Sequence, residues 1–345
     1  MKNKTILINT AFFFLVLLVC VFCLFAFDMK DSFVVGPLTA DVSIEKLDTV
    51  DDLNQDEVIK LGFVGDIMLD RSVKKSINKN GGGDYSFPFQ KILPTLKSFD
   101  WLFGNLEGPV SDKGKKVCGS IYSFQMATSV PAVLKQNNFS VVSIANNHMF
   151  DYCYSAFVDT LQNLKSADLA YIGGGLDGDE AYNPKVFNVK DLKISAVAFS
   201  EFNEKVMGAA GDRGGVAIIS PERVCATVRR AREVADIVVA SFHFGDEYKA
   251  DPNLYQKNIA HLAVDCGADL VVGHHPHVTQ PLEYYNGKPI IYSLGNFIFD
   301  QNFSEETMKG NILSVEVKNK KVDNVLLIPY KINKFFQPEL VKGLE

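Results

Sequence analysis

The sequence is poor in cysteine and has no excess of basic residues, and each shortage excludes a class of protein. Six Cys among 345 residues are too few for a small scaffold held together by disulfides. Lys and Arg number 35 against 41 Asp and Glu, so the formal charge is −6 and gives no electrostatic footprint for nucleic acid. Repeats and low-complexity tracts are lacking, whereas 26 Phe and 12 Tyr favour a globular chain of one large or two small domains.

The net charge is unevenly distributed along the chain. Residues 1–27 carry only Lys2 and Lys4, which is a charge of +2. Residues 28–58 carry nine acidic and two basic residues, a charge of −7, so the remaining chain has a charge of only −1. The sequence therefore predicts a basic tip (1–5), an apolar segment (6–27), an acidic linker (28–58) and a nearly neutral body.

Residues 6–27 are uncharged and are predicted to form a transmembrane anchor. A helix of this length spans roughly 33 Å, enough for a bilayer core of about 30 Å. Lys2 and Lys4 before it and Asp28 and Asp31 after it predict a cytoplasmic N-terminus, which places the body outside the cytoplasm on a single-pass membrane protein. A cleaved signal peptide is the alternative, but its apolar region is usually shorter and ends in small residues, unlike VFCLFAF at 21–27.

Residues 59–330 show alternating strand and helix patterns, and 331–345 are predicted to be a tail. Continuous apolar runs that end in Gly-, Asn- or His-rich turns are typical of strands in a sheet covered on both faces, which favours an α/β fold. The strand-like runs are 61–64, 101–103, 141–144, 194–199, 237–240, 270–272 and 289–293; the helical patterns are 131–138, 156–167, 221–235 and 254–266; and 312–318 with 321–327 resemble a hairpin.

Most predicted strands end in residues that can coordinate a metal ion. In open α/β sheets, ligands bind beyond the carboxyl ends of the strands. Five of the six histidines lie at such ends, and the sixth, His261, lies in a predicted helix. Singly, each signal has an ordinary structural explanation, such as a helix cap for Asp66 or a core histidine for His243. The residues concerned are Asp66, Asn105, Glu107, Asn147, His148, His243, His274, His275 and His277.

Taken together, these residues predict a site for a divalent metal. Three imidazoles within the segment GHHPHV (273–278), beside a strand end, have little structural purpose. Imidazole, carboxylate and amide ligands suit Zn, Mn or Fe, and the mixed cluster is large enough for one ion or two. A pair of ions would polarise a phosphoryl-type oxygen and activate water near neutral pH. His148 is assigned as the acid that protonates a leaving group.

Six segments, in order along roughly residues 60–301, resemble the CapA family of poly-γ-glutamate capsule biosynthesis proteins. They are Gly65–Leu69, Asn105–Pro109, Ala145–His148, His243–Tyr248, Gly273–Val278 and Tyr292–Gln301. The resemblance implies a metallophosphatase-like domain of the calcineurin-like phosphoesterase superfamily, a four-layer αββα sandwich. A membrane anchor ahead of the domain also suits the family.

The resemblance also implies roles for individual residues. The metal ligands would be Asp66, Glu107, Asn147, His243, His274, His275 and His277, with the register among the last three left open. Glu107 is favoured over Asn105 as the bridging ligand, because such a ligand needs negative charge. Asn105, Asn146, Glu247 and Asn296 are assigned to substrate binding. Met68 and Met149 stand where the superfamily has a ligand and an acid, although Asp151 is close to His148.

Three functions fit these features. The first is an anchored, metal-dependent hydrolase or transferase that acts on a surface polymer, by resemblance poly-γ-glutamate. The second is a non-enzymatic export or assembly subunit of a capsule synthase complex, and the third is an envelope phosphodiesterase. The metal cluster favours the first and third, and the missing ligands favour the second. A polymer substrate predicts an open groove, with Tyr248, Tyr284 and Tyr285 as candidates for its wall.

The cysteines beyond the anchor would face an oxidising compartment, where disulfides are permitted. A bridge between Cys118 and Cys153 would staple a loop of the site. Buried free thiols are the alternative, and Cys225 and Cys266 fit it because both lie in helical patterns.

Overall fold

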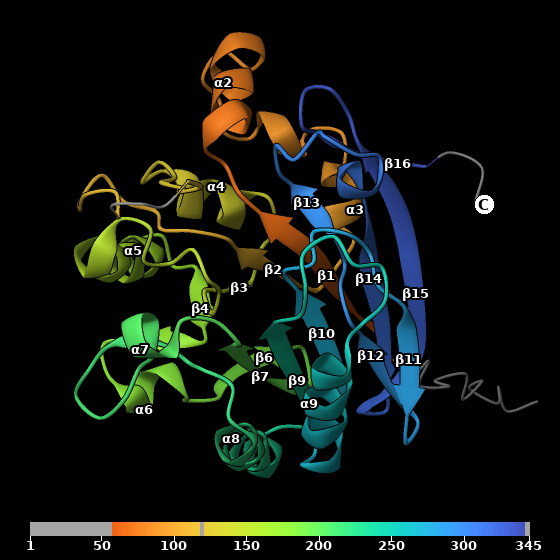
Figure 1. Cartoon of the computed structure of the whole chain (residues 1–345). Helices are drawn as coiled ribbons and strands as arrows, with labels where there is room; N and C mark the ends of the chain where they lie inside the picture. The colour runs from red at the N-terminus through yellow and green to blue at the C-terminus, as the bar shows by residue number, and fades with distance from the viewer. Residues whose placement is uncertain (1–56, 118–120, 342–345) are drawn as a thin grey trace, which may run out of the picture. The chain divides into compact units, whose positions relative to one another are not determined.

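The computed structural model describes residues 57–117 and 121–341 of the chain, which form two packed β-sheets with helices outside them (Figure 1). The predicted tip and anchor, and the linker up to residue 56, lie outside the described residues. Within 57–117 and 121–341, no helix has the length and apolarity needed to cross a bilayer.

The first sheet combines parallel and antiparallel strands. Its order is β16-β15-β14-β1-β2-β3-β4, and β13 also pairs with β1. Strands β1 to β4 are parallel, and β14 joins β1 from the other side in antiparallel register. The strands are β1 (Ile59–Ile67), β2 (Trp101–Leu106), β3 (Val141–Ser143), β4 (Ala170–Ile172), β13 (Asn296–Ile298), β14 (Lys309–Lys318), β15 (Lys321–Ile332) and β16 (Pro338–Leu340).

The second sheet has the order β11-β12-β10-β9-β7-β6. Its central strands β7, β9, β10 and β12 are parallel, and both edge strands are antiparallel to their neighbours. The strands are β6 (Lys185–Val189), β7 (Leu192–Ser200), β9 (Ile237–His243), β10 (Leu270–His274), β11 (Leu282–Tyr285) and β12 (Lys288–Ile291); the short β5 (Gly174–Gly175) and β8 (Gly215–Val216) pair separately.

Three apolar clusters hold the layers together. Side chains such as Phe63 and Phe103 of the first sheet meet Val239 and Val272 of the second sheet between the two sheets. The outer face of the first sheet packs on α2 to α5, and that of the second sheet on α8 and α9 (Figure 1). The helices are α2 (Arg71–Asn80), α3 (Leu93–Leu96), α4 (Val130–Gln136), α5 (Cys153–Ser166), α6 (Gly178–Ala181), α7 (Glu204–Met207), α8 (Pro221–Val234) and α9 (Leu254–Asp265).

The α/β prediction is confirmed, and every predicted apolar run lies in or overlaps a strand. The C-terminal hairpin forms as β14 and β15. The predicted tail boundary at 330 differs from the structure, because β15 continues to Ile332 and β16 adds a further strand. The short strands β4 to β6 and helix α2 were not predicted, because their sequences are short or strongly polar.

The expectation for Cys225 and Cys266 is wrong, because these residues form a disulfide. Cys225 lies in α8 and Cys266 caps the C-terminus of α9, so the bond joins neighbouring helices on the outer face of the second sheet. Their Cα atoms are 5.2 Å apart, well within the range that a disulfide spans. Cys153 is an exposed free thiol, and Cys118, its predicted partner, lies outside the described residues.

Replacing Cys225 and Cys266 together by Ala is expected to lower the free energy of unfolding by about 2–4 kcal/mol, because the bond closes a long loop in the unfolded chain. Denaturant titration of the oxidised proteins measures the difference. Reduction should destabilise the wild type equally and leave the double variant unchanged. Cys153→Ala is the matched control and should match the wild type; equal stability of all oxidised variants would contradict the bond.

Candidate metal centre

The predicted site residues meet because the strands that carry them are in register. On the first sheet, Asp66 of β1 pairs with Asn105 of β2 and with Asn296 of β13. On the second sheet, His243 of β9 pairs with His274 of β10. The carboxyl ends of these parallel strands therefore deliver the side chains to one edge of the two-sheet core.

Two glycines permit the close backbone approach that the site needs. A Cβ atom on Gly65, just before Asp66, would lie 1.8 Å from the carbonyl oxygen of Gly295. A Cβ atom on Gly273, just before His274, would lie 1.9 Å from the carbonyl oxygen of Tyr292. Any larger residue would push these strand ends apart, so both positions require glycine.

The loop after β10 is backbone-strained where it presents its histidines. His275 and His277 have φ angles of 99° and 58°, values that L-residues other than glycine rarely adopt. Such strain persists only where the surrounding structure holds it, and it concentrates at functional sites. The His277 ring thereby faces Asp66 and Glu107, and the His275 ring lies against His243 and Phe202.

Asp66, Glu107 and His277 form the fully buried centre of the cluster. His277 Nδ1 lies 3.4 Å from Asp66 Oδ2, and His277 Nε2 lies 3.5 Å from Glu107 Oε1. Asn105 Nδ2 donates hydrogen bonds to Asp66 Oδ1 (2.8 Å) and Glu107 Oε2 (3.3 Å). One ligand atom from each of the three residues lies within 4.8 Å of the others, as a metal site requires.

Asn296 fixes the orientation of the His277 ring. Its Oδ1 lies 2.9 Å from His277 Nδ1 and can only accept, so Nδ1 carries the proton. In the neutral form of His277 the lone pair is therefore on Nε2, which faces Glu107. Metal-binding histidines commonly donate their second N–H to an oxygen in this way.

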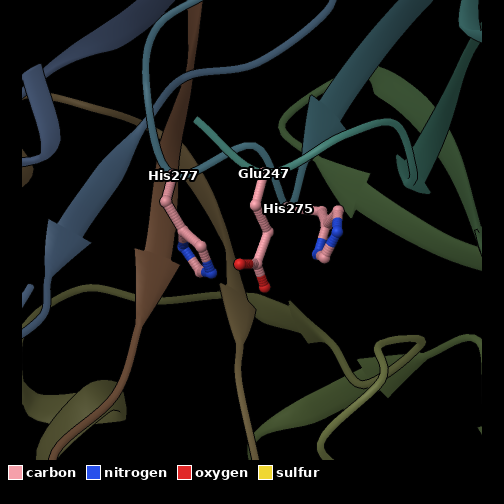
Figure 2. A group of neighbouring side chains, drawn as sticks. All are labelled: Glu247, His275 and His277. Carbon is pink, nitrogen blue, oxygen red and sulfur yellow. The ribbon is translucent and has the colours of Figure 1, made fainter. Parts of the chain in front are cut away.

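A second candidate group shares His277 with the first. Figure 2 shows the Glu247 carboxylate between the rings of His275 and His277, and one ligand atom from each lies within 4.8 Å of the others. Glu247 is exposed, whereas both histidines are buried. Glu247, which the sequence assigned to substrate binding, therefore also lies where it could bind a metal ion.

The other predicted ligands surround these two groups. His243 Nε2 lies 2.8 Å from Asn147 Oδ1, and the His243 ring lies 4.8 Å from the His275 ring. His274 Nδ1 lies 3.4 Å from Asp66 Oδ1, with its ring against Phe103 of the inter-sheet core. Of the three histidines at the end of β10 and in the loop after it, His275 and His277 thus belong to the candidate metal-binding groups. His274 lies behind Asp66.

The pKa values show a cluster that is short of positive charge. Burial and the Asp66 charge raise the pKa of Glu107 well above its ordinary value. Burial alone would lower the pKa of His277, but the carboxylates of Glu107 and Asp66 outweigh it and raise the pKa to about 9. Burial would likewise raise the pKa of Asp66, but His274 and His277 lower it well below its usual range.

His243 and His275 are neutral at physiological pH. Burial, reinforced by the neighbouring imidazoles, lowers the pKa of His275 to about 3 and that of His243 well below its ordinary value. Neutral imidazoles keep a lone pair for a metal, which protonated ones do not.

These residues fit a divalent cation. Glu107 Oε1, His275 Nδ1 and both ring nitrogens of His274 are buried, and within the described structure none has a hydrogen-bond partner. Buried polar atoms are ordinarily paired, and a cation bound by carboxylate and imidazole would pair with such atoms. The same cation would supply the positive charge that Asp66 and Glu107 lack. The ligand roles themselves stay predictions.

His148 stands at the rim of the cluster and is oriented by Asp151. Its Nδ1 lies 2.8 Å from Asp151 Oδ2, and its Nε2 points toward Glu107 Oε1, 3.8 Å away. The ring of Phe124 packs against it at 4.1 Å. A cleft of about 470 Å³ opens here, lined by His148, Asn147, Glu247 and Asp151 among others.

Several residues have surroundings that their sequence does not indicate. Asn105, Asn146 and Asn296, predicted to bind substrate, lie fully buried beneath the cluster and hydrogen-bond to its members. Tyr248 lies beside His277 but is not among the residues that line the cleft. Tyr285 stacks on His261 in the second sheet's outer layer, and Tyr284 lies next to it on β11, so this pair does not line the cleft.

The sequence profile of the bacterial capsule synthesis protein PGA_cap matches residues 60–301. The chain belongs to the PGA_cap family. The matched region contains every predicted site residue, from Asp66 to Asn296. The "PGA biosynthesis protein CapA" of Bacillus subtilis (strain 168) is 35% identical over 280 residues, which cover 81% of this chain and 73% of that protein.

A second PGA_cap relative is the "Capsule biosynthesis protein CapA" of Bacillus anthracis, 34% identical over 258 residues. That alignment covers 72% of this chain and 62% of the relative. Among solved structures, a phosphatase from Mycoplasma pneumoniae is similar with a TM-score of 0.49 and 15% identity, covering 79% of this chain and 93% of that one.

We expect Asn296→Leu to weaken divalent-metal binding by about 10–100-fold, because the His277 ring loses the oxygen that fixes its tautomer. Calorimetric titration of the full-length protein with Mn²⁺ and Zn²⁺ measures the affinity. His277→Ala should abolish the binding altogether. Asn188→Leu, at an exposed position on β6, is the control and should bind like the wild type, and wild-type affinity in Asn296→Leu would refute the positioning role.

Proposed function

We propose that this PGA_cap protein is a metal-dependent hydrolase or transferase that acts on a poly-γ-glutamate type of surface polymer. The observation that carries the proposal is the placing of the His148–Asp151 pair at the mouth of the cleft, facing the buried Asp66, Glu107 and His277. A structural cluster would not need an oriented, solvent-accessible imidazole beside it. The names of the two Bacillus relatives supply the polymer class.

Asp66, Glu107 and His277 would hold one divalent ion, and His275 and Glu247, with Asn147 and His243 beside them, would hold a second. When bound, such ions polarise the oxygen of the bond to be broken and lower the pKa of water. The chain itself supplies the fixed ligand positions. Asn105 and Asn296 supply the hydrogen bonds that orient them.

His148 would donate the proton that the departing amine needs when a γ-glutamyl amide is cleaved. The Asp151 carboxylate accepts a hydrogen bond from the Nδ1–H of His148, so the proton to be donated is the one on Nε2, toward the cleft. Asp151 also accepts a hydrogen bond from the main-chain N–H of Phe124, so its own position is fixed. Asp151 is therefore a positioning residue for His148.

The open shape of the cleft supports a long substrate, since a closed pocket would admit only a chain end. Exposed Ile121, Tyr122 and Val206 border the cleft beside His148. A phosphodiester would suit the same ligands and the same acid. An envelope phosphodiesterase would therefore use this same site with a different substrate.

Replacing His148 by Ala should reduce kcat on γ-linked glutamate polymer by about 10²–10⁴-fold, because the leaving amine loses its proton donor. The same variant should lose far less on a γ-glutamyl p-nitrophenyl ester, whose leaving group needs no proton. Full-length protein, its metal content measured, is assayed on both substrates and on bis-p-nitrophenyl phosphate. Asp151→Asn should show the same pattern with a smaller loss.

His261→Ala is the matched control, because His261 lies on α9 outside the cluster and should leave all rates unchanged. Turnover of bis-p-nitrophenyl phosphate alone would move the substrate class to phosphodiesters. An equal loss on amide and ester would refute the proton-donor role of His148.

One observation favours the non-enzymatic assembly role. Met68, at the position of an expected ligand, is fully buried in the outer core of the first sheet, and its Sδ accepts a hydrogen bond from the N–H of Asp70. The cluster therefore has one ligand fewer than its superfamily pattern implies. Stoichiometric metal without turnover on any of the three substrates would favour an assembly subunit that contacts other capsule synthase subunits.

We further propose that residues 6–27 anchor the protein in the cell membrane with its body outside the cytoplasm. The Cys225–Cys266 disulfide supports this location, because disulfides persist mainly in oxidising compartments. The polymer and the membrane are then its partners.

A variant with Cys20, Cys23 and Cys118 replaced by Ser tests this topology, since it keeps exposed Cys153 and the disulfide. A membrane-impermeant maleimide should label this variant in intact cells, and the protein should sediment with membranes. Adding Cys153→Ser should remove the label. Labelling only after lysis would place the body in the cytoplasm.

A further inference from the structure

A second cleft continues the groove that begins at His148. It has a volume of about 560 Å³ and shares Val117, Phe150 and Val206 with the cleft at the metal centre. We call it the distal cleft; its lining residues are Val117, Phe150, Cys153, Tyr154, Val206, Asp212, Arg213 and Gly214. Together the two clefts form one groove that leads away from the reacting position.

The middle of this groove is apolar and open. Val206 is 69% exposed and Tyr154 is 44% exposed, although both are large apolar side chains on the groove wall. Buried Phe150 forms its floor and packs against Tyr154 and Phe157. Exposed apolar groups along a groove that joins a reaction site indicate contact with the carbon chain of a ligand.

Basic residues are frequent in the segments that border the far end of the groove. Segments 111–117 and 203–214, which border the distal cleft, together contain five basic residues (Lys113, Lys115, Lys116, Lys205 and Arg213) and three acidic ones (Asp112, Glu204 and Asp212). One of these, Lys113, is paired with Asp159. The opposite end, at the metal centre, carries Glu247 and Asp151 instead. Among the residues that line the groove, the end at the metal centre is therefore acidic, and the distal end holds one cation and one anion.

Arg213 is the cation that lines the distal cleft itself. A guanidinium has five N–H donors, and among the described residues one of them is used, in a 3.4 Å hydrogen bond to the main-chain oxygen of Lys205. Asp212 lies on the same wall and offsets part of the charge. The remaining donors suit a carboxylate, which a guanidinium binds in bidentate fashion.

We infer that the distal cleft binds the part of an extended anionic chain that lies beyond the reacting bond, with Arg213 as its carboxylate-binding residue. Methylene groups of the chain contact Val206 and Phe150, and a side carboxylate reaches Arg213. This inference rests on the proposed function for the direction of the chain, but the binding it describes does not depend on turnover.

Binding of γ-linked glutamate oligomers to the full-length protein tests the inference. The wild type should bind a long oligomer more tightly than a dimer, because only the long one reaches the distal cleft. Arg213→Gln should weaken binding of the long oligomer about tenfold or more and leave the dimer unchanged, as expected for loss of a charged hydrogen bond. Val206→Asp, at an exposed position that lines both clefts, should also weaken binding of the long oligomer by repelling the chain.

Two substitutions on α8 are the matched controls. Arg229→Gln removes an exposed cation and Val234→Asp adds a charge at an exposed valine, both away from the groove, and both should bind like the wild type. An undiminished length preference in Arg213→Gln and Val206→Asp would overturn the inference. Loss in Val206→Asp alone would also overturn it, because a neutral or lipid chain would then be the better occupant.

Measuring turnover as well as binding distinguishes a failure of the distal-cleft inference from a failure of the proposed hydrolase function. Arg213→Gln should keep wild-type kcat on the γ-glutamyl p-nitrophenyl ester, which is too short to reach Arg213. If the wild type shows the length preference without turnover, the distal cleft stands and the hydrolase proposal fails. If His148→Ala loses turnover while the length preference is absent from the wild type, the hydrolase stands and the distal cleft fails.

Discussion

Asp66 and Glu107 are two carboxylates buried close to each other, and the rest of the site is organised around their charge. Both are fully shielded from solvent and are joined through the amide of Asn105. Buried charges are stable only when they are paired, and His277 is the side chain that pairs with both. A bound cation would meet the same demand more fully, and it would pair with Glu107 Oε1, which has no hydrogen-bond partner among the described residues.

The need to pair the buried charges of Asp66 and Glu107 accounts for the strained backbone of the loop that carries His277. His277 can reach both carboxylates only from a loop whose φ angles are unfavourable, and only if Gly65 and Gly273 allow the strand ends to approach. The cost of this strain is of the order of 1–3 kcal/mol per residue, which the inter-sheet core must offset. Phe103 links the inter-sheet core to the histidine cluster, because it packs in that core and against the ring of His274.

Sequence patterns located the strand ends, because local periodicity determines where strands form. They also predicted that the site residues meet, because parallel strands bring their carboxyl ends to one edge of a sheet. They could not reveal contacts that depend on the tertiary arrangement. Cys225 and Cys266 are 41 residues apart and meet only because α8 and α9 pack together. Asn296 matched a family motif, yet its use as a support for His277 follows from the pairing of β13 with β1. The sequence did place Asp151 near His148, because residues three apart in a turn can bring their side chains together.

The distribution of charge decides how an anionic polymer could reach this site. The net charge of −6 opposes it, but most of that charge belongs to residues 28–58 rather than to the body. Exposed charges act over about 8–10 Å at physiological ionic strength, so attraction must come from groups that line the groove itself. Arg213 lines one end of the groove, and a cation held by Asp66 and Glu107 would lie at the other. An anionic chain bridging these two positions would cross the apolar middle of the groove with its reacting bond beside His148.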